Sequence, residues 1–129
     1  MIYEEKTIET IPVLVPLKSC TELGKKVNDY LVTWRRERES EHKSTIAFAG
    51  YQRDSYIIDA KTPRFGSGEA KGTIESSIRG DDLYIMVDVC NYSLTYSMAG
   101  MTNHMSPDDH YQDLKRVIAA AAGKAHRVN

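Results

Sequence analysis

A strand, a capped helix and the beginning of a second strand follow one another near the end of this sequence, and that order restricts the fold more than any other feature. Residues 83–89 (LYIMVDV) are almost continuously apolar, as is typical of a strand in a parallel sheet covered on both faces. Ser106 followed by Pro107 predicts a helix N-terminus, and Gly123 predicts the end of that helix. Residues 124–129 (KAHRVN) then predict a strand that a crossover connection places beside residues 83–89.

This order predicts an α/β fold with three layers and a mainly parallel sheet. Asp109 completes a capping box with Ser106, and a first helix is expected from about Thr21. Helical spacing predicts buried apolar stripes, made of Leu23, Val27, Tyr30, Leu31 and Trp34 in the first helix and Leu114, Val117, Ile118 and Ala121 in the last.

The remaining segments give weaker signals. Pro12 and Pro16 disfavour a helix and predict an extended segment before the first helix. Short apolar runs predict strands at residues 46–49 and 56–59, and residues 73–78 fit either a strand or a helical turn. Residues 92–105 are expected to form a long loop.

Composition limits the partners and the setting of the chain. Its 129 residues suit one compact domain, and its formal net charge of -1 argues against nucleic acid as a partner. The longest apolar runs are far shorter than a membrane span, so we expect no membrane partner. Cys20 and Cys90 are the only two cysteines and no signal peptide precedes them, so we predict reduced thiols in a cytoplasmic protein.

Two polar clusters are candidate functional sites, one for a ligand and one for a metal ion. Asp88, Cys90 and Asn91 follow the apolar run at the end of the predicted strand, where ligands gather in open parallel sheets. The simpler interpretation, which we favour, is that Asp88 caps a loop and Cys90 packs as a small apolar residue. His104, Asp108, Asp109 and His110 match no dedicated zinc motif, so we predict no metal site.

The segment RFGSGE at residues 64–69 is the most informative short motif. It predicts a flexible turn that presents the ring of Phe65 and the carboxylate of Glu69 close together. Such a pair suits an adenine base, because the ring stacks on the base and the carboxylate accepts from its exocyclic amine. A plain hairpin turn is the alternative that composition alone favours.

Several segments in one order resemble the N-terminal part of ribose-phosphate pyrophosphokinase, in particular a divergent, longer form of that family. They are LGKKVNDYL at 23–31, RFGSGE at 64–69, ESSIRGDDLYI at 75–85, CNYSLTY at 90–96 and MSPDDHYQDLKR at 105–116. The resemblance covers most of residues 19–129. This sequence is longer than the usual family member over residues 32–60 and 92–105.

The resemblance implies a phosphoribosyltransferase-like α/β fold and a homo-oligomer. It implies transfer of diphosphate from ATP to ribose 5-phosphate, with Mg²⁺ bridging the phosphates, for nucleotide biosynthesis. It also implies that Phe65, Ser67 and Glu69 bind ATP; the family usually has Asp or Asn where Ser67 stands. Ser77 and Arg79 match a turn that contributes to a regulatory phosphate site in the family.

Residues 1–129 are expected to form a single N-terminal domain whose fold is incomplete, without the second domain. The family's metal-binding and catalytic segments lie beyond the matched part, so we expect no catalytic residue or metal ligand in this chain and no activity from it alone. The alternatives are a non-catalytic regulatory homologue, an oligomerisation module of the same family, or a phosphoribosyltransferase.

Overall fold

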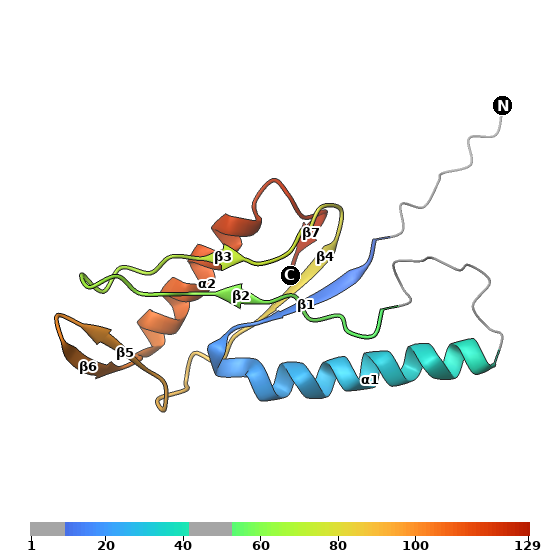
Figure 1. Cartoon of the computed structure of the whole chain (residues 1–129), viewed down its shortest axis with the longest axis horizontal. Helices are drawn as coiled ribbons and strands as arrows, with labels where there is room; N and C mark the ends of the chain where they lie inside the picture. Colours follow the sequence, from blue (N-terminus) through green and yellow to red (C-terminus); the bar gives the residue numbers. More distant parts are fainter. Residues whose placement is uncertain (1–9, 42–52) are drawn as a thin grey trace.

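The structure is a computed structural model that describes residues 10–41 and 53–129 (Figure 1). Its elements in chain order are β1 (Pro12–Pro16), a 3-10 turn (Lys18–Cys20), α1 (Thr21–Ser40), β2 (Ala60–Lys61), β3 (Thr73–Ile74), β4 (Asp82–Met86), β5 (Thr95–Met98), β6 (Met101–His104), α2 (Pro107–Ala121) and β7 (Arg127–Val128). The predicted strand at residues 46–49 lies outside the described residues.

A parallel sheet forms the centre of the described fold. Its strand order is β1-β4-β7, so β4 lies between two strands that both run parallel to it. Leu83 of β4 pairs with Val13 on one side and with Val128 on the other. The predicted α/β class and the predicted strand after the last helix are therefore confirmed.

Strand β1 begins and ends at a proline. Pro12 and Pro16 lack the amide hydrogen that a central strand needs, which suits a strand at the margin of the sheet. Leu14 is also contacted from the outside, because its amide donates to Tyr56 O at 2.7 Å and its carbonyl accepts from Ile58 N at 2.8 Å. The predicted strand at residues 56–59 is thus reduced to one parallel bridge, Leu14 to Ile57.

Strand β4 is shorter than the apolar run predicted. It ends at Met86 rather than at Val89, and it is not covered on both faces, because Tyr84 is 42% exposed. Beyond Met86 the chain leaves the sheet, and the amide of Asp88 donates to Ser19 Oγ at 2.9 Å. Polar contacts outside the sheet therefore end the strand at Met86, although the apolar run in the sequence continues to Val89.

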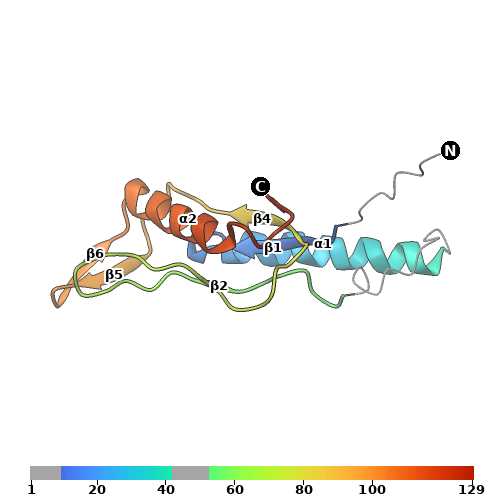
Figure 2. The same ribbon diagram turned by 90° about the horizontal axis from the view of Figure 1, so that it is seen from above.

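The hydrophobic core fills the space between the sheet and α2. Its buried members are Val13, Val15, Leu17, Ile58, Ile78, Leu83, Val117 and Ala121. Alternate residues of β1 face this core, so Leu14 points to the opposite side, on which α1 packs. Figure 1 shows α1 and α2 on different sides of the β1–β4 pair, and Figure 2 shows the same layers from above.

Helix α1 is rotated relative to the prediction, because only Val27 and Leu31 of the predicted stripe are partly buried. Leu23, Tyr30 and Trp34 are 53%, 64% and 58% exposed, and the buried residues are Gly24, Asn28 and Val32. A Cβ on Gly24 would lie 2.6 Å from Pro16 Cβ, so the helix approaches β1 through its smallest residue. Asn28 Oδ1 accepts from Tyr56 N at 2.7 Å. Close approach and one buried hydrogen bond, rather than apolar area, therefore orient the helix.

Residues 92–105 contain a hairpin and not the predicted long loop. Strands β5 and β6 pair antiparallel from Thr95–His104 to Met98–Met101. Ala99 and Gly100 connect them with φ of 52° and 76°, and positive φ at both central residues is typical of tight hairpin turns. Thr95 and Tyr96 belong to residue types that are enriched in strands, which was the available signal in the sequence.

Helix α2 begins as predicted. Ser106 Oγ accepts from Asp109 N, and the Asp109 carboxylate accepts from Ser106 N, which completes the capping box. The helix ends at Ala121, and Gly123 follows with φ 74°. Val117 and Ala121 are buried as predicted and Leu114 is partly buried, whereas Ile118 is 42% exposed.

Candidate functional site

The connection between β2 and β3 is a tight hairpin turn. Phe65 N donates to Glu69 O at 2.9 Å, Gly68 N donates to Phe65 O at 2.8 Å, and Arg64 bridges to Ala70. Gly68 has φ +87°, which matches a three-residue loop whose last residue is left-handed. The spacing of Phe65 and Glu69 follows from this loop, because it leaves the two residues opposite each other.

Alternation along the two arms separates the turn into two faces. Arg64 is largely shielded and Ala70 is buried, and both point toward α2. Phe65 is 52% exposed and the Glu69 side chain is 64% exposed, and opposite residues of an antiparallel pair project to the same face. Ser67 is exposed at the tip. The turn therefore presents an aromatic ring and a carboxylate side by side to solvent.

A charged cluster joins the inner face of the turn to α2. Arg64 Nη2 donates to Asp113 Oδ1 at 2.9 Å, and the two side chains are only 7% and 6% exposed. Arg64 Nη1 lies 3.6 Å from Asp109 Oδ1. Burial raises the pKa of the Asp113 carboxyl, and the Arg64 charge and a Thr62 hydrogen bond oppose that shift. On the outer side, Arg116 Nη2 lies 3.7 Å from Glu69 Oε1.

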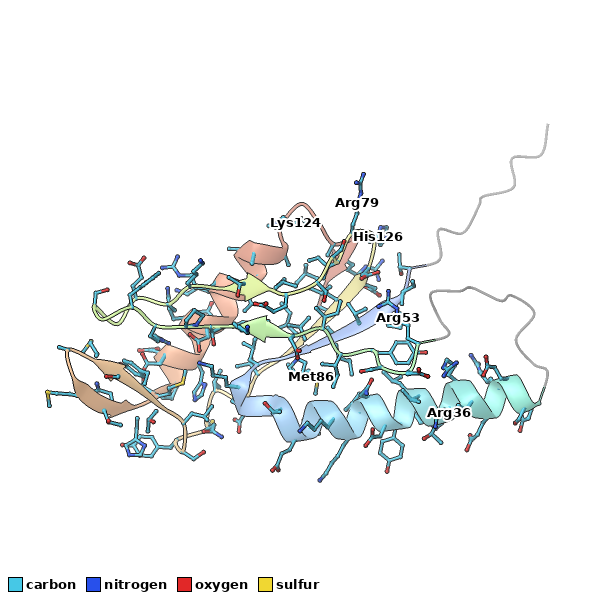
Figure 3. All side chains as sticks on the ribbon, in the orientation of Figure 1. Arg36, Arg53, Arg79, Met86, Lys124 and His126 are labelled. Carbon is cyan, nitrogen blue, oxygen red and sulfur yellow. The ribbon has the colours of Figure 1, made fainter. Side chains whose placement is uncertain are left out.

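The second predicted site lies beside the other end of α2. An open pocket of about 790 Å³ is lined by Gly72, Thr73, Ile74, Ser76, Ser77, Ile78, Arg79, Ala120, Gly123 and Lys124. The backbones of Gly80 and Lys124 meet there, with Gly80 N donating to Lys124 O at 3.4 Å. Figure 3 shows Arg79 and Lys124 at the end of the molecule away from the β5–β6 hairpin. Ser77 and Arg79 thus share a pocket with a second cation.

The other candidate residues have structural roles. Asp88 Oδ1 accepts from Cys90 N, so Asp88 caps a loop as predicted. Asn91 Oδ1 accepts from Ser93 N and Leu94 N and stabilises the same loop. Cys90 is exposed, which corrects the prediction that it packs as a small apolar residue. Both thiols are free, and burial raises the pKa of the Cys20 thiol.

The histidines near α2 contact backbone carbonyls. His110 is buried, with Nε2 2.6 Å from Asn91 O, and His104 stacks on Tyr92 with Nδ1 2.9 Å from Tyr92 O. Within residues 10–41 and 53–129, no group of three His, Cys, Asp or Glu side chains is placed to hold a metal ion.

Sequence reasoning missed the residues that support the turn. The RFGSGE motif assigns no role to Arg64 and does not mark Asp113 or Tyr96 as its partners. One signal was present, because Asp109 and Asp113 stand four residues apart and Asp113 interrupts the apolar stripe of α2. A buried carboxylate at such a position predicts a cationic partner.

The fold and the site together describe a small α/β domain with a parallel sheet and an exposed turn that carries an aromatic ring and a carboxylate. The family model for the N-terminal domain of ribose phosphate pyrophosphokinase matches residues 12–129, so the chain belongs to that family. No curated protein and no solved structure matches the chain. No helix in the described part of the chain is long and apolar enough to cross a membrane.

Proposed function

We propose that this domain supplies the adenine-binding turn of a ribose-phosphate diphosphokinase, which transfers diphosphate from ATP to ribose 5-phosphate. The observation that carries the proposal is the exposed pair of Phe65 and Glu69 on one face of a tight turn. Family membership over residues 12–129 supports the reaction. We assign this reaction to nucleotide biosynthesis in the cytoplasm.

The pair has the chemistry to distinguish adenine from guanine. A ring such as that of Phe65 stacks on either base, because every base has a π-face. A carboxylate such as that of Glu69 accepts from the exocyclic amine of adenine, whereas guanine places an acceptor oxygen at that position. The Arg116 side chain, 3.7 Å away, pairs with Glu69 without covering it, since the Glu69 side chain remains 64% exposed.

Magnesium is the metal that the reaction calls for, to bridge the phosphates. The described residues do not fit a site for it, because no metal-holding cluster is formed among them and because Asp109 and Asp113 are engaged by Arg64. We therefore assign the recognition of adenine to this domain and derive no step of the metal chemistry from the residues that the structure describes.

The test is formation of AMP from ATP that depends on ribose 5-phosphate, measured on the whole protein. A preference for ATP over GTP is expected, and Glu69→Ala should raise the KM for ATP about fivefold and reduce that preference, because one hydrogen bond is lost. The KM for ribose 5-phosphate should not change. Activity without any dependence on ribose 5-phosphate, or no loss of nucleotide preference, contradicts the proposal.

The alternative, an oligomerisation module, is favoured by one observation. Leu23, Tyr30 and Trp34 form an exposed apolar stripe along α1, and Tyr30 and Trp34 contact each other with ring centroids 6.1 Å apart. Lys26 and Glu37 lie on the same flank of this stripe. Two antiparallel copies of α1 therefore place each lysine beside the glutamate of the other copy, and we propose a second copy of this chain as the partner.

Sedimentation velocity tests the α1 contact independently of the nucleotide proposal. Trp34→Lys should shift the wild-type oligomer to a smaller species, because it places a charge in the apolar contact. Tyr92→Ala is the matched control, since Tyr92 is 67% exposed on another surface. Equal sedimentation of Trp34→Lys and wild type contradicts the α1 contact but leaves the nucleotide proposal standing.

Ser77, Arg79 and Lys124 are proposed as an anion site in the open pocket at the end of α2. Two cationic side chains and a hydroxyl suit phosphate oxygens. Titration with inorganic phosphate should show binding that Arg79→Gln weakens and that sodium chloride competes with. Equal phosphate affinity in wild type and Arg79→Gln contradicts the assignment.

A further inference from the structure

The guanidinium of Arg64 contacts three separate parts of the chain around the turn. It donates to Gly68 O at 3.1 Å within the turn, and to Asp109 O at 2.8 Å and Asp113 Oδ1 at 2.9 Å on α2. Its Cζ also lies 4.9 Å from the centre of the Tyr96 ring on β5. One nearly buried side chain therefore ties the turn to a helix and to a hairpin.

The β5–β6 hairpin also contacts the turn directly. Ala99 N donates to Gly66 O at 3.2 Å, and Met98 Sδ lies 2.7 Å from the position that a Cβ on Gly68 would occupy. Both views place this hairpin beside the tip of the β2–β3 connection (Figure 1, Figure 2). The β5–β6 hairpin therefore supports the tip of the turn through one backbone hydrogen bond and one side-chain contact.

Stability alone does not account for the buried charges. A buried ion pair is often no better for stability than apolar residues of the same volume. Arg64 Nε is also buried, and no acceptor reaches it among the described residues. What the arrangement does provide is direction, since the planar guanidinium fixes several groups at once in one geometry.

We propose that Arg64 and Tyr96 are positioning residues that hold the Phe65–Glu69 turn in its nucleotide-binding conformation, with the β5–β6 hairpin as the support. The inference rests on the proposed function. Neither residue touches the nucleotide; each acts through the turn. A turn that is already fixed loses less conformational freedom when ATP binds, so affinity depends on the support.

The test replaces Tyr96 and measures both nucleotide affinity and local order. Tyr96→Leu should weaken ATP binding by about 3- to 30-fold in calorimetry on the whole protein, because a desolvated cation–π contact is lost. Amide exchange at Phe65 and Gly68 should accelerate by a similar factor. Tyr96→Phe keeps the ring and should restore both values. Tyr111→Leu is the matched control, because it removes an exposed contact with Lys115, at 5.2 Å, elsewhere on α2.

Each outcome decides the matter. Weaker ATP binding together with faster exchange in Tyr96→Leu, both restored by Tyr96→Phe, supports the positioning role. Unchanged exchange at Phe65 and Gly68, or faster exchange with unchanged ATP affinity, overturns it. If the wild-type protein does not bind ATP, the proposed function fails, and the positioning role fails with it; the exchange measurement then shows whether the turn is held at all.

Discussion

Gly72, on the β2–β3 connection, lies against the backbone of helix α2, and Gly72→Ala tests the packing that positions the site. A Cβ at this residue would lie 2.5 Å from Arg116 O, 2.6 Å from Arg116 C and 2.9 Å from Val117 N. All three are backbone atoms within a helix, so they cannot move aside as a side chain does. Val117 is fully buried in the core, which fixes the helix further.

The expected loss follows from this overlap. Ordinary van der Waals contact begins at 3.4 Å, so the hairpin must move about 0.9 Å away from α2, and overpacking of this kind costs about 1–3 kcal/mol. Urea unfolding followed by circular dichroism measures the difference in the free energy of unfolding between wild type and variant.

Gly66→Ala is the matched control on the same hairpin. No atom of the described residues lies within 4 Å of a Cβ there. This variant should be neutral or more stable by about 0.4–1 kcal/mol, because alanine restricts the unfolded chain. If Gly72→Ala is as stable as Gly66→Ala, the hairpin does not pack on α2 as described.

Three other predictions concern stability. Asn28→Ala removes the acceptor of the Tyr56 amide and should lower the free energy of unfolding by about 1–3 kcal/mol, measured by urea unfolding. Ser106→Ala removes the helix cap and should lower it by about 1 kcal/mol, seen as an earlier thermal transition. Because burial raises the pKa of Asp113, the folded chain binds that proton more tightly than the unfolded chain does. The free energy of unfolding should therefore decrease as the pH rises above 3.8, the ordinary pKa of an aspartate. Asp113→Asn should lack this pH dependence.

The parts of the fold that depend on local chemistry could be predicted from the sequence. The capping box of Ser106 and Asp109, the end of α2 just before Gly123 and the final strand all follow from short-range preferences. The orientation of α1 did not follow, because it depends on a distant partner. Gly24 packs on Pro16 and Asn28 binds Tyr56, contacts that outweigh the apolar stripe in deciding which face is buried.

The candidate site was predictable to a similar extent. The motif predicted that Phe65 and Glu69 lie close together, and the loop geometry at Gly68 explains their spacing. The support from Arg64, Asp113 and Tyr96 was not predictable, because it joins three segments that only the tertiary fold brings together.

Whether the Phe65–Glu69 turn binds adenine is tested most simply by comparing the ATP dissociation constants of Phe65→Ala and wild type. Calorimetry on the whole protein measures both. Loss of a stacking ring should weaken binding by roughly 5- to 150-fold, and Phe65→Trp should retain it. Tyr111→Ala, which removes an exposed aromatic ring on α2, should bind as wild type does. Equal ATP affinity in Phe65→Ala and wild type would show that the ring of Phe65 does not bind the nucleotide.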